Sequence, residues 1–140
     1  MDDMQHAART GATLRAYRQS LGLSAQRLAE KLNVVPVSVT AWESGMEHIP
    51  QPVWHLVEEL RRDLIDEVRE LLQTEQELHQ ESEGETPNGN WSLPVYRSQR
   101  DYGNADVATP IGDFETYNNA QLLGGLLLES MGYTVGYRYE

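Results

Sequence analysis

Apolar residues recur at helical spacing in the first part of the chain. Leu14, Tyr17 and Leu21 lie three and four residues apart, and the next residue is a glycine, which favours the left-handed end of a helix. Ser24 is a good N-cap for a second, short helix, and Asn33 tolerates the left-handed conformation that would end it. This pattern predicts two helices joined by a short connection.

A third helix is expected directly after a tight turn. Pro36 suits its first turn and Gly45 its end, while Val39 and Trp42, three residues apart, would face inward. The segment therefore reads as a helix, a three-residue turn and a helix, preceded by a packing helix.

From Pro52 to Gln80 the chain predicts one long amphipathic helix. Its apolar stripe is wider than a strict heptad seam, so packing against the first three helices and, over the later half, a dimer seam both remain open. The stripe consists of Val53, Trp54, Leu56, Val57, Leu60, Leu64, Val68, Leu71 and Leu72.

The composition changes after this helix. Glu81 to Ser92 is acidic and holds proline, glycine and asparagine, as in a linker. Leu93–Ser98 and Tyr133–Tyr139 predict strands, and in the second strand alternate residues would be buried.

Between these strands, Tyr117–Met131 predicts a helix interrupted by Gly124 and Gly125. The pair marks either close approach to another backbone or a weak helix, since each glycine costs about 1 kcal/mol relative to alanine. Two strands and one helix bury little surface alone. We therefore expect this module to dock on the long helix or to dimerise.

The predicted fold class is mainly α, with a small α+β module at the C-terminal end. The expected organisation is a helix-turn-helix domain in residues 1–52, the long helix in 53–80, an acidic linker in 81–92 and a strand-helix-strand module, expected to dimerise, in 93–140.

Charge and composition narrow the function. The net charge is -11, yet residues 1–48 carry five basic and five acidic side chains, so the imbalance lies outside the predicted helix-turn-helix. There is no cysteine, no apolar run near Met1, and no phosphate loop or nucleophile motif, and the four histidines lack zinc spacing. We expect a cytoplasmic protein that is not an enzyme and holds no metal or cofactor.

Residues 11–52 resemble the Cro/C1-type helix-turn-helix family. The resemblance rests on LRAYRQSLGLS at 14–24, the Leu-Ala pair at 28–29, Val34 and WESG at 42–45. It implies that Arg18 pairs with Glu43, tying the first helix to the end of the third. The alternative is that these two are independent surface charges.

The resemblance also implies a DNA interface in which Pro36–Ser44 is the recognition helix in the major groove of double-stranded DNA. Its outward residues offer small apolar groups, which suit thymine methyl groups, and two hydroxyls, which can hydrogen-bond several bases or a phosphate. Gln26 and Arg27 are the expected polar contacts, and Arg15, Arg27 and Lys31 the expected phosphate contacts. The outward set is Val35, Pro36, Val37, Ser38, Thr40 and Ala41.

Two positions depart from the family pattern. Ala25 stands where a phosphate-contacting glutamine is common, and Met46-Glu47-His48 stands where basic residues are frequent. Low DNA affinity, or a helix-turn-helix used as a scaffold for protein binding, would fit these departures.

Asp113-Phe114 leading into a leucine-rich helix gives the whole chain a looser resemblance to small anti-CRISPR-associated autorepressors. That resemblance implies a bacterial or phage homodimer that represses its own operon. The alternative is an antitoxin-type or other interaction protein whose C-terminal module binds a protein partner. A membrane-surface role is not expected, because anionic lipid would repel the acidic long helix.

Overall fold

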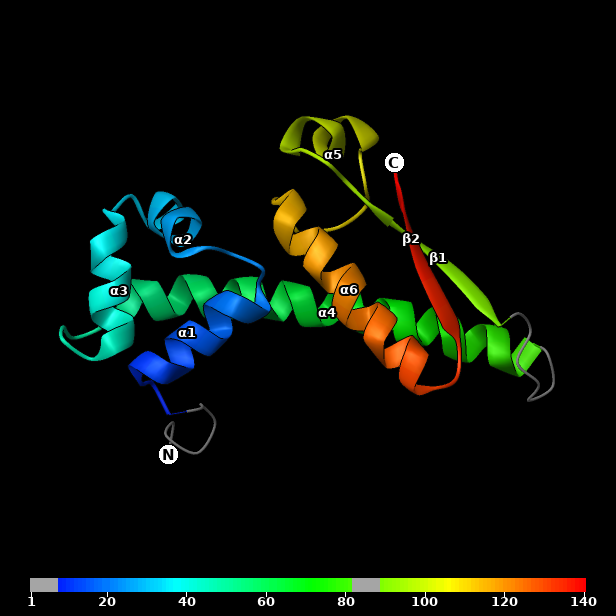
Figure 1. Cartoon of the computed structure of the whole chain (residues 1–140), viewed down its shortest axis with the longest axis horizontal. Helices are drawn as coiled ribbons and strands as arrows, with labels where there is room; N and C mark the ends of the chain where they lie inside the picture. Colours follow the sequence, from blue (N-terminus) through cyan, green and yellow to red (C-terminus); the bar gives the residue numbers. More distant parts are fainter. Residues whose placement is uncertain (1–7, 82–88) are drawn as a thin grey trace. The chain divides into compact units, whose positions relative to one another are not determined.

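The structure is a computed structural model and describes residues 8–81 and 89–140. It divides into two compact units, residues 1–62 and 63–140, and the longest helix contributes to both (Figure 1). The elements are α1 (Gly11–Ser20), α2 (Ala25–Leu32), α3 (Pro36–Ser44), α4 (Gln51–Glu81), β1 (Asn90–Val95), α5 (Gln99–Ala105), α6 (Phe114–Ser130) and β2 (Thr134–Tyr139). The predicted class, mainly α with a small α+β module, is confirmed.

Local capping chemistry sets the helix ends of the first unit. The Ser24 hydroxyl accepts a hydrogen bond from the Arg27 N–H at the start of α2, and Asn33 ends that helix with a φ of 57°. Gly22 and Gly45, with φ of 73° and 83°, follow α1 and α3. The predicted helix-turn-helix, with its turn at residues 33–35, is therefore present.

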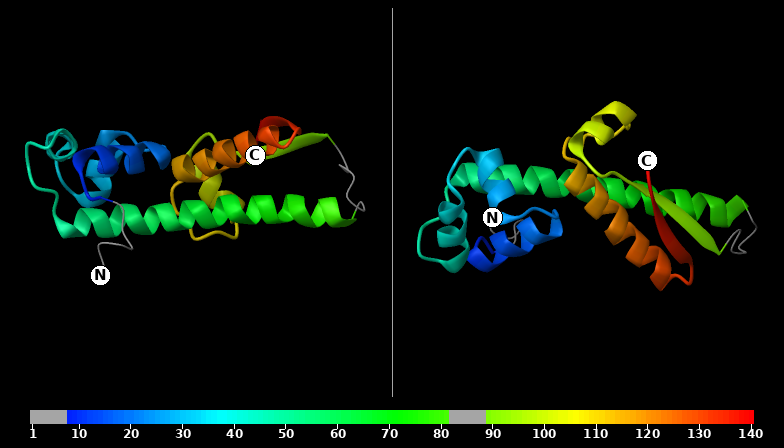
Figure 2. Two further views of the ribbon diagram at one scale, coloured as in Figure 1. Left: turned by 90° about the horizontal axis from the view of Figure 1, so that it is seen from below. Right: turned by 45° about the horizontal axis from the view of Figure 1, so that its top comes forward.

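The core of the first unit joins these three helices to the beginning of α4. Leu14 of α1, Leu28 of α2, Val39 of α3 and Val57 of α4 are each fully buried. Figure 2 shows the three short helices beside the first turns of α4. This packing assigns the early part of the long apolar stripe to the core of the unit.

Gly11 allows the start of α1 to touch the end of α3. A β-carbon at Gly11 would lie 2.7 Å from the Trp42 carbonyl oxygen and would collide with that of Glu43. Both obstacles are backbone atoms, which cannot move aside as a flexible side chain can. Glycine at this position thus sets how closely α1 approaches α3.

The second unit is a two-stranded parallel sheet with α6 in the connection between its strands. β1 pairs with β2 in a register that sets Asn90 beside Thr134 and Val95 beside Tyr139. One buried cluster joins Leu93, Leu128 and Tyr133, with Leu71 and Leu72 of α4 packed against it. Docking of the C-terminal module on the later part of the long helix, one of the two expectations, is observed.

The predicted bounds of the first strand of this unit are wrong, and one of its helices was not predicted. β1 begins at Asn90 and ends at Val95, earlier than the predicted Leu93–Ser98, because Ser98 serves as the N-cap of α5. The sequence pattern gave no sign of α5. The short helix carries one buried apolar residue, Tyr102, whose hydroxyl donates to the Ile111 carbonyl over 2.6 Å. Of the expected linker at 81–92, residues 82–88 lie outside the described part of the chain.

The glycine pair in α6 marks close packing. A β-carbon on Gly124 would collide with the Leu71 side chain, and one on Gly125 with the Tyr137 hydroxyl. Both glycines are buried, and Figure 2 shows α6 beside the later part of α4. Of the two interpretations of the pair, close approach holds, although not to another backbone as the sequence predicted. The obstacles are side chains of α4 and β2.

Candidate nucleic-acid interface

A bidentate ion pair fixes α3 to α1. Arg18 Nε donates to Glu43 Oε2 over 2.6 Å and Arg18 Nη2 to Glu43 Oε1 over 2.9 Å. Arg18 Nη1 also donates to the Leu23 carbonyl over 3.0 Å, so the same guanidinium holds the loop before α2. The hydrogen bond to Glu43 raises the pKa of Arg18 against the opposing effect of desolvation. Arg18 and Glu43 are therefore one structural unit and not two independent surface charges.

The outward face of α3 is mostly apolar. Val37 is 69% exposed, and Val35, the N-cap residue of α3, is 59% exposed. Pro36 and Thr40 are exposed, while Ser38 and Ala41 are half-buried at the flank of the face. The structure thus brings the predicted reading residues together on one helix, with two valines as the most prominent groups.

The hydroxyl groups near this face donate hydrogen bonds within the helix. Thr40 Oγ1 donates to the Val37 carbonyl over 2.9 Å, and Ser44 Oγ donates to the Ala41 carbonyl over 3.1 Å. A threonine hydroxyl has one proton, so Thr40 in this rotamer offers a base only its acceptor lone pair and its methyl group. The sequence alone predicts that the Thr40 hydroxyl can hydrogen-bond several bases as donor or acceptor. In the structure its proton is already donated, so it can only accept.

The polar residues of α2 pair with one another. Arg27 Nη1 lies 2.8 Å from Glu30 Oε2, and Gln26 Nε2 lies 3.5 Å from Glu30 Oε1. Lys31 is exposed in the last turn of α2, and Arg15 is exposed on α1. The Glu30 carboxylate offsets part of the positive charge that Arg27 would present to a phosphate.

Arg9 was not among the residues singled out from the sequence. Its guanidinium donates to Gln51 Oε1 over 3.1 Å and to Glu58 Oε1 over 2.9 Å, and it lies 5.8 Å from the Trp54 ring centre. It therefore ties the segment before α1 to α4. In the sequence, the role of Arg9 is signalled only by its position directly before the Thr10 N-cap, and this signal is weak.

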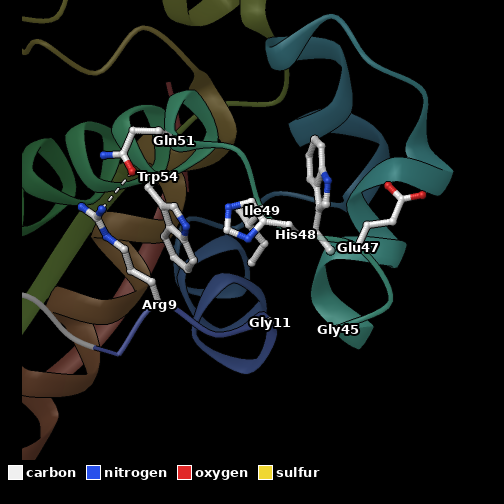
Figure 3. A pocket seen from close by; sticks show the side chains of 9 residues that line it. Arg9, Gly11, Gly45, Glu47, His48, Ile49, Gln51 and Trp54 are labelled. Atoms are coloured by element: carbon white, nitrogen blue, oxygen red, sulfur yellow. Dashed lines mark hydrogen bonds between the residues drawn. The ribbon is translucent and has the colours of Figure 1, made fainter.

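A pocket of about 320 Å³ opens beside Arg9. Figure 3 shows Arg9, Gln51 and Trp54 gathered at one side of it, with Glu47 farther off. Arg9 and Gln51 bond each other at one side of it, and we assign it no ligand. It is lined by Arg9, Gly11, Trp42, Gly45, Glu47, His48, Ile49, Gln51 and Trp54.

The described part of the chain shows neither a metal-binding cluster nor a membrane-spanning helix. Within residues 8–81 and 89–140, histidine, aspartate and glutamate side chains form no group of three that could hold a metal ion. In the same part of the chain, no helix combines the length and the apolar character that crossing a bilayer requires.

Comparison with known proteins agrees with this geometry. Residues 14–54 match a protein-family model described as helix-turn-helix, and the match spans α2, the turn, α3 and the beginning of α4. No curated protein matches the chain significantly. Residues 14–54 thus form a helix-turn-helix domain of the Cro/C1 type, the kind of domain by which transcription regulators bind DNA.

Proposed function

We propose that the protein is a homodimeric, sequence-specific repressor that inserts α3 into the major groove. The observation that carries the proposal is the exposed face of α3, held at its far end by the Arg18–Glu43 pair within a helix-turn-helix domain. A fixed helix presents its side chains to base edges without first having to be ordered.

Contacts to phosphate come from α1 and α2 in this proposal. Arg15, Arg27 and Lys31 supply the positive charge, and Gln26 a further polar contact. Residues 1–62 carry seven basic and seven acidic side chains, so the unit has no excess of positive charge. Non-specific binding should therefore be weak, and affinity should depend on the fit of α3 to its site.

Dimerisation belongs to residues 63–140 in this proposal. This unit carries four basic and fifteen acidic side chains and so repels DNA, which leaves it free to join two chains. A two-fold dimer places its half-sites about 34 Å apart or at a multiple of that distance. The expected operator is an inverted repeat in the DNA upstream of the protein's own gene.

The first experiment is fluorescence anisotropy with a labelled duplex from the protein's own upstream region. A scrambled duplex of the same composition is the control, and both are titrated at about 150 mM salt and at lower salt. The expected result is a preference of about a thousandfold with two chains bound per duplex. Weak and equal binding to both duplexes would contradict the proposal.

The phosphate contacts are tested with Arg27→Ala. This variant should weaken binding to every sequence alike and reduce the salt slope by about 1, because one phosphate contact is lost. Arg62→Ala is the matched control, since Arg62 is exposed on α4 outside the proposed interface. An equal loss in both variants would indicate an effect of net charge alone.

The alternative is an antitoxin-type protein whose second unit binds a partner. The observation in its favour is the exposed apolar surface of α6, where Leu126 is 62% and Met131 51% exposed. Patches of this kind mark interaction sites. A protein that co-purifies with the full chain and is lost on Leu126→Glu would support this function.

A further inference from the structure

The hydrogen bonds of the small sheet determine which backbone groups remain unpaired. The Thr134 N–H donates to the Gly89 carbonyl over 2.6 Å and the Glu140 N–H to the Val95 carbonyl over 3.0 Å. Residues of a parallel strand alternate between its two neighbours. Within this register, the even-numbered residues of β2 bond β1, and its odd-numbered residues point their N–H and C=O groups away from the sheet.

The outer edge of β1 is blocked. The groups that point outward there belong to Asn90, Ser92 and Pro94. Pro94 has no N–H to offer, and the Arg138 side chain donates to the Ser92 carbonyl. Proline and a covering side chain are ordinary devices against edge pairing. A further strand therefore cannot add to the sheet at β1.

The outer edge of β2 has no such protection. Its outward groups belong to Val135, Tyr137 and Tyr139, and no hydrogen bond from another described residue reaches them. Tyr137 is 40% and Tyr139 61% exposed. A sheet of two strands is also smaller than independent stability in water usually requires. The β2 edge is the place where this sheet can grow.

We propose that the β2 edge pairs antiparallel with the β2 edge of a second copy of this chain. The two-fold axis would pass beside Tyr137, which gives a four-stranded sheet in the order β1-β2-β2-β1. This inference rests on the homodimer of the proposed function and adds the surface that forms it.

The sequence of β2 is self-complementary in this register. Tyr137 lies opposite Tyr137 of the second copy, and Val135 opposite its Tyr139, so aromatic and β-branched side chains meet on one face. On the other face, Arg138 lies opposite Gly136. No two like charges face each other, although each unit is strongly acidic as a whole.

Two arginine side chains beside β2 have partners within the same chain. Arg97 lies 4.1 Å from the Tyr139 ring centre, and Arg138 Nε lies 2.6 Å from Glu140 Oε1. Two of the unit's four basic side chains are therefore beside β2, away from most of its carboxylates in sequence.

Site-specific cross-linking tests the pairing, because the chain has no cysteine. Tyr137→Cys introduces one thiol per chain, and directly opposed residues in a hydrogen-bonded antiparallel pair have Cα atoms about 5.5 Å apart, within disulfide range. Mild oxidation should convert most of this variant to a disulfide-linked dimer. Asn104→Cys, exposed on α5, is the control and should remain largely monomeric on a denaturing gel.

The register has a test of its own. A mixture of Val135→Cys and Tyr139→Cys chains should form mainly the mixed disulfide, since these positions face each other across the axis. Dimers that form equally well at every cysteine position would overturn the inference.

Proline substitutions test the edge in the full chain by light scattering. Tyr139→Pro removes one outward N–H and should give a monomer. Ser92→Pro is the control for the other edge: it removes an N–H from β1, whose outer edge is already blocked, and should stay dimeric. Tyr139→Ala is the control for the side chain: it keeps the N–H and should lose much less dimer than Tyr139→Pro. Circular dichroism establishes that the variants are folded. A dimeric Tyr139→Pro would overturn the inference.

The same samples separate this inference from the proposed function. If the unsubstituted chain is a folded monomer that still prefers the upstream duplex, the edge dimer is overturned and DNA recognition stays intact. A dimer cross-linked through Tyr137 that shows no preference among duplexes would support the edge dimer and contradict the repressor.

Discussion

Removing Arg18 is the substitution whose effect on the first unit can be worked out most fully. In Arg18→Ala, the Glu43 carboxylate loses the two hydrogen bonds that the guanidinium donates to it. The Leu23 carbonyl also loses the hydrogen bond that it accepts from Arg18. The Glu43 side chain is only 8% exposed, so water cannot fully replace these contacts.

The expected loss in the free energy of unfolding follows from this burial. Breaking a buried ion pair by removing one partner costs about 3–5 kcal/mol, because the remaining charge stays uncompensated. The pair lies near the surface, and truncation to alanine admits some water, so we expect about 3 kcal/mol. With a urea dependence of about 1–3 kcal/mol per molar, the unfolding midpoint should fall by roughly 1–3 M.

Urea unfolding followed by tryptophan fluorescence measures this loss. Trp42 and Trp54 lie in the first unit, and Trp91→Phe removes the one tryptophan of the second unit. In that background the fluorescence reports on the helix-turn-helix unit alone. The reference chain and the Arg18→Ala chain differ then by the ion pair only.

Two further variants separate the charge from the packing. Arg18→Lys keeps the positive charge but loses the planar fork, so its stability should fall between those of the reference and Arg18→Ala. The double variant Arg18→Met with Glu43→Leu removes both charges and should recover most of the loss. A loss below about 1 kcal/mol in Arg18→Ala would refute the reasoning, since that is the range of an exposed pair.

Three further predictions concern other parts of the chain. Thr40→Ala should change preference at one or two bases without a uniform loss, measured against duplexes with single base changes. Gly11→Ala should destabilise the first unit by about 1–3 kcal/mol in urea, because its β-carbon meets the backbone carbonyl oxygens of Trp42 and Glu43. Gly103→Ala, with open space around it, is the control. Burial raises the pKa of Tyr102 and Tyr117 to about 12 from 10.0, so stability present below pH 10 should fall as the pH rises to 12. Tyrosinate absorbance with circular dichroism checks this, and ionisation of all seven tyrosines near pH 10 without unfolding would contradict it.

The parts of the candidate interface that could be predicted from the sequence are those whose structure is set by local interactions. Capping at Ser24, the left-handed residues Asn33 and Gly45, and Pro36 in the first turn of α3 each act within a few neighbours. The helix-turn-helix could therefore be located from the sequence. The internal hydrogen bond of Thr40 could not, because a rotamer follows from the surrounding packing.

The sequence by itself determined the helix-turn-helix unit and the separation of charge between the two halves of the chain. The tertiary structure alone decided that β1 and β2 run parallel, that Gly125 lies against Tyr137, and that Arg138 covers the edge beside Pro94 while the β2 edge stays open. The physical reason is the range of the interactions. Helix caps and turns satisfy backbone groups within one segment, whereas strand pairing joins residues more than forty positions apart, so its partner and register are fixed only when the whole unit folds.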